Sequence, residues 1–363
     1  MGGQELDYVN EAFATNWIAP LGPNVNGFEK AIEEYLQEDV QAAALSSGTA
    51  AIHLGLQLLG VAYGDEVLCQ SFTFSASANP ITYLGAKPIF IDSEENTWNI
   101  CPDLLEEAIV NRIKEGKKPK AIIAVHLYGM PYKIKEVTNV ANKYGIPVLE
   151  DSAEALGSTY FGANCGTFGD IGILSFNGNK IITTSGGGAL VTREKKIKEK
   201  AVFLATQARD NEPHYQHSHI GYNYRMSNVI AGIGRGQMEV LDKRVSARRE
   251  NFNFYKKELD FYDSISFLEE PTGSFSNRWL TCILTSSYEE REKIRLSLEE
   301  ENIESRPLWK PMHLQPVFKD CKAFTNGVSE KLFNNGLCLP SGSNLSENDL
   351  QLITNLIKKN ISL

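Results

Sequence analysis

The 363-residue chain is long enough for one large and one smaller domain, each with its own core. Its net charge of −9 argues against broad binding to nucleic-acid phosphates, and its 42% hydrophobic content excludes disordered and fibrous classes. The six cysteines are scattered without a CxxC pair, as is typical of reduced thiols rather than of a disulfide framework or a zinc site. No apolar run is long enough to span a membrane and no signal sequence is recognisable, so we predict a soluble cytoplasmic protein.

Apolar and β-branched runs alternate with segments of helical spacing over the first 192 residues. This alternation predicts an α/β fold with a mostly parallel sheet covered by helices on both faces. Strands are expected at 41–46, 66–69, 88–92, 121–126, 147–151, 172–176 and 189–192, and the intervening helices include 50–59, 104–114 and 134–143.

The pattern changes after Met226. A long polar helix is predicted over 229–259, followed by short strands and charged helices at 288–301 and 347–359, as in a smaller α+β domain. We therefore divide the chain into a large domain, 1–235, and a linker helix with a small C-terminal domain, 236–363.

Lys180 lies between the end of an apolar run and a glycine-rich turn, within the segment SFNGNKIITTSGGG (175–188). Most lysines are ordinary surface groups. Glycines, however, let the backbone pass close to a ligand, and a lysine near buried surface can have a nucleophilic amine. On these residues alone, a functional lysine and a surface lysine are equally favoured.

Three further segments follow predicted strands. The turn 46–50 could cradle a phosphate with its exposed amides, or simply cap a helix. Asp151 could keep a pyridinium nitrogen protonated, or cap the next helix, and the rings in 72–74 could stack on a heterocycle or belong to the core. Because ligands collect at the carboxyl ends of parallel strands, these segments and Lys180 together predict a pyridoxal-phosphate site.

The same segments, in this order, resemble the DegT/DnrJ/EryC1/StrS family of pyridoxal-phosphate-dependent sugar aminotransferases. The resemblance covers nearly the whole chain and implies fold type I, the aspartate-aminotransferase-like fold. That fold has a mostly parallel seven-stranded sheet in its large domain and a smaller C-terminal α+β domain. The matching motifs are SSGTAAIHL (46–54), FTFSAS (72–77), VHLYGMP (125–131), EDSAEALGS (150–158), SFNGNKIITTSGGGA (175–189), GYNYRMSN (221–228) and RPLWKPMHLQP (306–316).

The resemblance also implies roles for individual residues. Lys180 is expected to form the Schiff base with pyridoxal 5′-phosphate and to move protons, and Asp151 is expected to pair with the ring nitrogen. Glu154 lies where relatives often carry His or Gln near the ring hydroxyl. An ionised carboxylate would repel a phenolate there, so its role stays open. The remaining cofactor contacts are expected from Phe74, which would stack on the ring, and from Gly48, Thr49, Ala50 and Ser175, which would bind the phosphate.

Partners and substrates follow from the same resemblance. It implies an obligate homodimer with shared active sites, in which Asn223 and Arg225 reach the partner's cofactor. The subgroup that matches best aminates C4 of UDP-4-keto-6-deoxy-N-acetylhexosamines in polysaccharide biosynthesis. L-glutamate is the donor, and the cofactor passes through pyridoxamine 5′-phosphate in a ping-pong cycle. Candidate substrate contacts are Trp17, Arg306, Trp309 and His313, although Arg306 and Trp309 could equally serve packing.

Two alternatives remain at this stage. A pyridoxal-phosphate sugar dehydratase would replace the Schiff-base lysine with His, so Lys180 argues against it. A non-catalytic regulator that binds a sugar nucleotide or the cofactor is disfavoured by the complete set of motifs. The histidine-rich stretch 214–219 is more typical of a solvated loop than of a metal site, and no metal is predicted.

Overall fold

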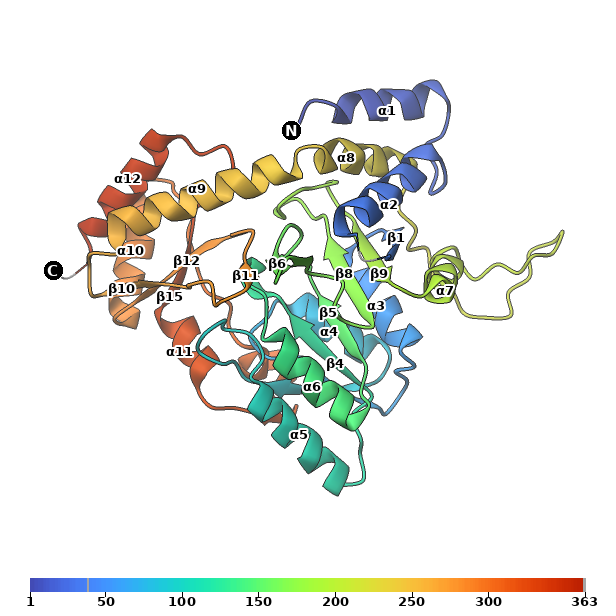
Figure 1. Ribbon diagram of the computed structural model, residues 1–363, viewed down its shortest axis with the longest axis horizontal. Coiled ribbons are helices and arrows are strands. Elements are labelled where there is room, and N and C mark those ends of the chain that lie inside the picture. Colours follow the sequence, from blue (N-terminus) through green and yellow to red (C-terminus); the bar gives the residue numbers. More distant parts are fainter. Residues whose placement is uncertain (38, 362–363) are drawn as a thin grey trace.

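The computed structural model describes residues 1–37 and 39–361, which form a layered α/β architecture (Figure 1). Within these residues, the central sheet has eight strands in the order β1-β9-β8-β5-β4-β2-β3-β14. The strands from β8 to β14 are parallel to one another, whereas β9 runs antiparallel to both of its neighbours. Their bounds are β1 Gln41–Leu45, β2 Glu66–Gln70, β3 Lys87–Ile91, β4 Ala121–Val125, β5 Val148–Asp151, β8 Ile171–Ser175, β9 Gly188–Thr192 and β14 Ala323–Phe324.

The seven strands predicted from the sequence are confirmed, each within one residue at either end. The eighth, β14, comes from the C-terminal third of the chain and pairs with β3 at the edge of the sheet. Asp92, fully buried just after β3, accepts hydrogen bonds from the backbone amides of Asn326, Gly327 and Ser329 and so fixes the segment that follows β14.

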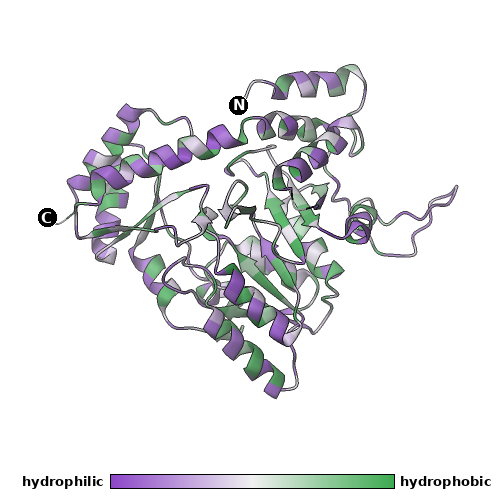
Figure 2. Cartoon of the chain, viewed as in Figure 1, coloured by the Kyte–Doolittle hydropathy of each residue, from purple (hydrophilic) through white to green (hydrophobic). Residues whose placement is uncertain are grey.

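Helices cover both faces of the sheet. α3, α4 and α7 contribute to one buried apolar cluster with the strands, and α5 and α6 contribute to another. The strands are accordingly almost uniformly hydrophobic in Figure 2, as expected for a sheet buried on both sides. The helices are α3 Gly48–Leu58, α4 Ser75–Tyr83, α5 Pro102–Lys114, α6 Ile134–Tyr144 and α7 Lys195–Ala205.

Where one helix was predicted over 229–259, the structure has two, α8 (Asn228–Met238) and α9 (Leu241–Leu259). α8 packs closely on α1 (Glu5–Ala14) and α2 (Pro23–Leu36), and its glycines permit this contact. A Cβ on Gly234 would lie 2.7 Å from the Phe28 ring. Val240 leaves helical geometry (φ −117°, ψ 8°), and α9 then continues toward the C-terminal layer.

The C-terminal part forms an antiparallel sheet in the order β10-β12-β15-β13, which packs with helices on a separate apolar cluster. Its elements are β10 Ile265–Phe267, β12 Thr281–Thr285, α10 Tyr288–Glu300, β13 Arg306–Pro307, α11 Val328–Asn335, β15 Gly336–Leu339 and α12 Glu347–Lys358. The smaller elements are η1 Leu127–Gly129, β6 Thr159–Tyr160, β7 Ala163–Asn164, β11 Ser274–Phe275, η2 Met312–Leu314 and η3 Pro316–Phe318. In the described part of the chain, every helix is too short or too polar to cross a membrane.

Candidate active site

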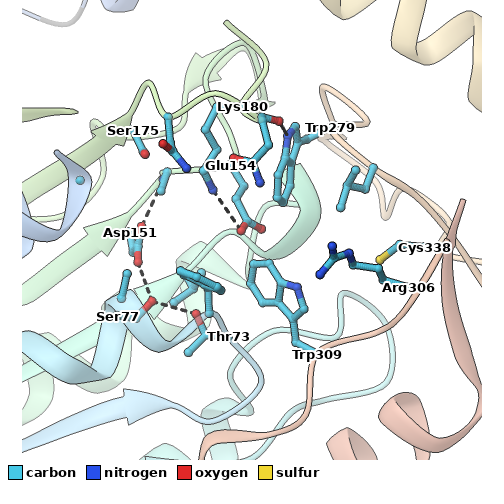
Figure 3. Close-up of a pocket in the computed structure, with 18 of the residues that line it drawn as sticks. Thr73, Ser77, Asp151, Glu154, Ser175, Lys180, Trp279, Arg306, Trp309 and Cys338 are labelled. Atoms are coloured by element: carbon cyan, nitrogen blue, oxygen red, sulfur yellow. Dashed lines mark hydrogen bonds and ion pairs between the residues drawn. The ribbon is translucent and has the colours of Figure 1, made fainter. Parts of the chain in front are cut away.

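A cavity of about 760 Å³ opens at the carboxyl edge of the central sheet, where β4, β5 and β8 end. Its floor includes Asp151 and Ser175, the last residues of β5 and β8. The opposite wall comes from the C-terminal part and includes Trp279, Arg306 and Trp309 (Figure 3). Its volume is in the range of small-molecule sites, and its position is where parallel sheets bind ligands.

Lys180 points into this cavity from the turn that follows β8. Its Nζ lies 3.4 Å from Glu154 Oε1 and 4.3 Å from the centroid of the Trp279 ring. The indole N–H of Trp279 donates to the carbonyl of Asn179 at 2.7 Å, which fixes the ring beside the lysine. The amine is therefore held between a carboxylate and an aromatic face.

Glu154 is almost completely buried, with 4% of its surface exposed. Its Oε2 accepts the backbone N–H of Tyr128 at 2.7 Å, and its Oε1 faces Lys180. Tyr128 takes the left-handed conformation (φ 54°, ψ 22°) that few non-glycine residues adopt, and its hydroxyl accepts the backbone N–H of Trp309. Burial raises the pKa of Glu154 to about 7, against the opposing effects of the Lys180 charge and the Tyr128 amide.

Asp151 lies deeper in the cavity and is 3% exposed. Its Oδ2 accepts from the Ser77 hydroxyl at 2.7 Å, and its Oδ1 accepts from the Ala153 amide at 3.1 Å. Ser77 also shares a hydrogen bond of 2.8 Å with the hydroxyl of Thr73. The carboxylate is thus oriented by its neighbours and able to pair with a protonated ring nitrogen.

At the other end of the cavity lies the N-terminus of α3. Gly48 and Thr49 line the cavity, as does Ser175. A Cβ on Gly48 would lie 3.0 Å from the Ser175 Cβ, a tight contact, so glycine favours this close approach of the turn to β8. The prediction for Ala50 needs correction: its amide donates to the capping hydroxyl of Ser47 at 3.0 Å and is not available to a phosphate. The amides of Gly48 and Thr49 precede any intrahelical acceptor and could hold an anion at this end of the cavity.

Phe74 completes the cavity wall. Its side chain is 55% exposed, and its ring centroid lies 5.4 Å from that of Trp309. Both rings line the cavity, so Phe74 offers an open face on which a flat ring can stack. Arg306 lies at the mouth with 78% of its side chain exposed, and its guanidinium is paired with Glu304.

Besides Ala50, four predicted residues do not line this cavity. His313 bonds to the Ser71 hydroxyl at 2.6 Å and lies 3.3 Å from Glu330, so its ring is engaged elsewhere. Arg225 forms an ion pair with Glu29 and donates to the Ala44 carbonyl. Its guanidinium is therefore bound within its own chain and does not extend from the surface. The other two, Trp17 and Asn223, are exposed and lie outside the cavity.

Two residues beside Lys180 and Glu154 were not assigned a role from the sequence. Tyr128 lies within the VHLYGMP motif, which was a usable signal. Trp279 lies in no motif, and it reaches the cavity from a position 99 residues after Lys180 in the sequence. Only the packing of the C-terminal part reveals it.

The groups that line the cavity fit pyridoxal phosphate. They comprise a lysine amine for an aldehyde, a buried oriented carboxylate for a pyridinium, an exposed aromatic face for the ring, and helix N-terminal amides for a phosphate.

Comparisons with known proteins agree with this chemistry. Residues 1–358 match the model of the DegT/DnrJ/EryC1/StrS aminotransferase family. EpsN of Bacillus subtilis (strain 168), whose name places it among pyridoxal phosphate-dependent aminotransferases, is 53% identical over 96% of this chain and 91% of its own length. GDP-perosamine synthase of Escherichia coli O157:H7 is 39% identical over 98% of this chain and 95% of its own length.

A solved structure has the same fold and carries the expected cofactor form. Spr1654 of Streptococcus pneumoniae, described as a sugar aminotransferase in its PMP-form, has a TM-score of 0.91 and 26% identity. The match covers 98% of this chain and 96% of the other. The fold expected from the sequence is therefore confirmed.

Proposed function

The chain belongs to the DegT/DnrJ/EryC1/StrS aminotransferase family and is a pyridoxal-phosphate-dependent sugar aminotransferase; from this premise we propose that it transfers an amino group from L-glutamate to C4 of a UDP-linked 4-keto-6-deoxy-N-acetylhexosamine. When bound, the cofactor supplies an aldehyde that carries the amino group between the two substrates and a ring that withdraws electrons. The protein supplies binding, orientation and proton transfer.

The observation that carries this proposal is the convergence of Lys180, Asp151 and the α3 N-terminus on one cavity. We assign to Lys180 Nζ the covalent attachment of the cofactor and the movement of the proton at the reacting carbon. Asp151 keeps the ring nitrogen protonated, and Phe74 stacks on the ring. The phosphate is bound by Gly48, Thr49 and Ser175.

The substrate assignment rests on the outer half of the cavity and on the motifs of the chain. Arg306 at the mouth is positioned to meet a diphosphate, and Trp309 offers an aromatic surface to a sugar or base. The motifs at 175–189 and 306–316 are similar to those of the UDP-sugar subgroup. The competing substrate is a GDP-linked 4-keto sugar, which is favoured by the 39% identity to GDP-perosamine synthase.

We also propose that a second copy of the chain completes the site. Large apolar side chains are exposed in the N-terminal segment and in the loop that precedes Asn223. Such exposure is costly for a surface that stays in contact with water. They include Leu6 and Leu21 at 65%, Tyr215 at 80% and Ile220 at 83% exposure. In such a dimer, Trp17 and the exposed Asn223 would reach the partner's cavity. We place this enzyme in the cytoplasm, where its six free cysteines stay reduced.

Trapping and spectroscopy test these assignments. Borohydride reduction of the loaded protein, followed by peptide mapping, should label Lys180, and a Lys180→Arg variant should lose both the label and the yellow colour. Glutamate should convert the wild-type spectrum to that of the pyridoxamine form, which a non-catalytic binder would not do. Label on any other lysine would refute the role of Lys180.

A substrate screen separates the nucleotide alternatives. UDP-, GDP- and dTDP-linked 4-keto-6-deoxy sugars should be offered to the pyridoxamine form, with NMR of each product. We expect turnover of the UDP-N-acetyl sugar and an amine at C4. Loss of a hydroxyl without amination would indicate the dehydratase alternative, and preferential turnover of the GDP sugar would overturn the nucleotide assignment.

A further inference from the structure

Lys180 and Glu154 form an acid–base pair at the centre of the cavity. We propose that Glu154 stores the proton of Lys180: it is a carboxylate while the amine carries its charge, and it becomes a neutral acid when covalent attachment removes that charge. The inference rests on the proposed attachment of the cofactor at Lys180, and it adds a role for Glu154 that the sequence leaves open.

The two carboxyl oxygens of Glu154 have different partners. The Tyr128 amide donates to Oε2 at 2.7 Å, so that oxygen is occupied, and Oε1 alone faces the amine at 3.4 Å. Figure 3 shows the two side chains pointing toward each other across the cavity. Because both are nearly buried, at 11% and 4% side-chain exposure, bulk water competes poorly for the proton.

Among the residues that the structure describes, Glu154 pairs with a single cation. Over 1–37 and 39–361, Lys180 is the one basic group that forms an ion pair with it. Arg306, on the far wall, is largely exposed and paired with Glu304. The loss of the Lys180 charge is therefore not compensated by another cation.

In the described part of the chain, the other titratable groups that act on the pair are a carboxyl, a phenol and thiols. Asp151 on β5 is an acid that disfavours the charged form of Glu154. Burial raises the pKa of Tyr128 in η1 and of Cys282 on β12 well above their usual values, so both stay neutral. The thiol of Cys338 on β15 is buried beside Cys282.

These contacts determine the charge of Glu154. Burial favours the neutral acid, and the Lys180 ammonium is the strongest influence in the opposite direction. With the ammonium present, the pKa of Glu154 is about 7. Without it, the pKa rises further and the carboxyl is protonated at neutral pH.

The proton balance of attachment follows. If the cofactor is held by Lys180 as an uncharged imine, the ammonium proton of Nζ would pass to Glu154 Oε1. The cofactor would supply the aldehyde group, whose oxygen would depart as water with the two hydrogens that remain on nitrogen. One proton thus moves between two side chains, and none is released to solvent.

A cofactor-free experiment tests the pair directly. In the apoprotein at pH 8, infrared spectroscopy should find no protonated carboxyl assignable to Glu154 in the wild type. It should find one in Lys180→Met, and none in the double variant Lys180→Met/Glu154→Gln. As a matched control, Lys143→Met removes the lysine that pairs with the half-exposed Glu106 (2.6 Å) and should produce no acid band. A folded Lys180→Met protein without the band would overturn the inference.

Reconstitution provides a second readout. Adding cofactor to apoprotein at pH 8, above the pKa of Glu154 of about 7, in weak buffer with a pH indicator should release close to no protons per site from the wild type and close to one from Glu154→Gln. Equal release from both would contradict the inference. Borohydride labelling of Lys180 in both proteins separates the two proposals. Failure to label refutes the attachment site, whereas labelling with equal proton release refutes only the role of Glu154.

Discussion

Glu150 and Glu154 are four residues apart, both are buried, and they have opposite electrostatic environments. Glu150 belongs to β5 and faces the turn 166–169, whose amides of Gly166, Phe168 and Gly169 donate to it at 2.6 to 2.8 Å. His126 Nε2 contacts the same carboxylate at 2.7 Å. Glu154 faces the cavity and accepts hydrogen bonds from one backbone amide and one lysine amine.

The two pKa values differ accordingly. Burial alone would raise both, but the histidine and the backbone amides lower the pKa of Glu150 below its usual value. With fewer donors, Glu154 keeps a raised pKa of about 7. The number of fixed donors, not the depth of burial, therefore decides whether a buried carboxyl stays charged. The surroundings of Glu150 stabilise the fold, whereas those of Glu154 leave its carboxyl able to exchange a proton.

The largest expected effect comes from Glu150→Gln. The amide group of Gln cannot accept from all three backbone N–H groups and weakens the contact with His126. We expect a loss of about 3–5 kcal/mol in the free energy of unfolding, because hydrogen bonds to a charged group contribute about 1.5–3 kcal/mol each. Urea denaturation at pH 7 measures it. Because the pKa of Glu150 is lowered, its contribution is present above the unfolded value and is lost as pH falls through the folded value, so the variant and wild type should converge in acid. A loss below 1 kcal/mol would approach the effect of about 0.5 kcal/mol that is typical of surface substitutions, and would contradict a stabilising role for Glu150.

Glu154→Gln should act in the opposite direction. A pKa raised from 4.5 to about 7 disfavours the folded apoprotein as pH rises between these values. At 1.36 kcal/mol per pKa unit, removing the carboxyl should raise the free energy of unfolding by up to about 3 kcal/mol at pH 8. The gain should vanish near pH 4.5, where Glu154 is already protonated in the folded state. Unfolding curves at both pH values measure it, and a gain independent of pH would refute the assignment.

Ser77→Ala should have the smallest effect of the three. It removes the hydroxyl that donates to Asp151 at 2.7 Å, and hydrogen bonds to charged groups contribute about 1.5–3 kcal/mol, so we expect a loss near the lower end because the Ala153 amide remains. Cofactor affinity should fall with it, since Asp151 loses its orientation. Ser246→Ala, which breaks an exposed bond to Glu250, is the control and should change neither quantity. Equal effects of both substitutions would show that Ser77 has no special role.

Much of the large sheet and of the inner site could be predicted from the sequence. The strands are short apolar runs punctuated by polar turns, and this signal is local. The segments expected to face the cofactor follow strand ends, so the topology of a parallel sheet brings them to one edge. For that reason Lys180, Asp151, Gly48, Thr49, Phe74 and Ser175 were expected together and do line one cavity.

The features that could not be predicted depend on contacts between distant parts of the chain. Trp279 reaches Lys180 only through the packing of the C-terminal part, and His313 is drawn toward Ser71 and Glu330 by the same packing. The ion pair of Arg225 with Glu29 joins residues far apart in sequence. The Ala50 amide is occupied because the Ser47 hydroxyl caps the helix and accepts its hydrogen bond. The sequence permits this cap but does not require it.

The edge strand β14 has a practical consequence for dividing the molecule. Residues from beyond position 320 complete a sheet built otherwise from the first 192, and Asp92 secures the junction with three main-chain amides. A fragment ending near residue 235 would expose the free edge of β3, and unpaired sheet edges recruit other strands. Such a fragment should self-associate when produced alone, so the two parts are best expressed, crystallised and engineered as one polypeptide.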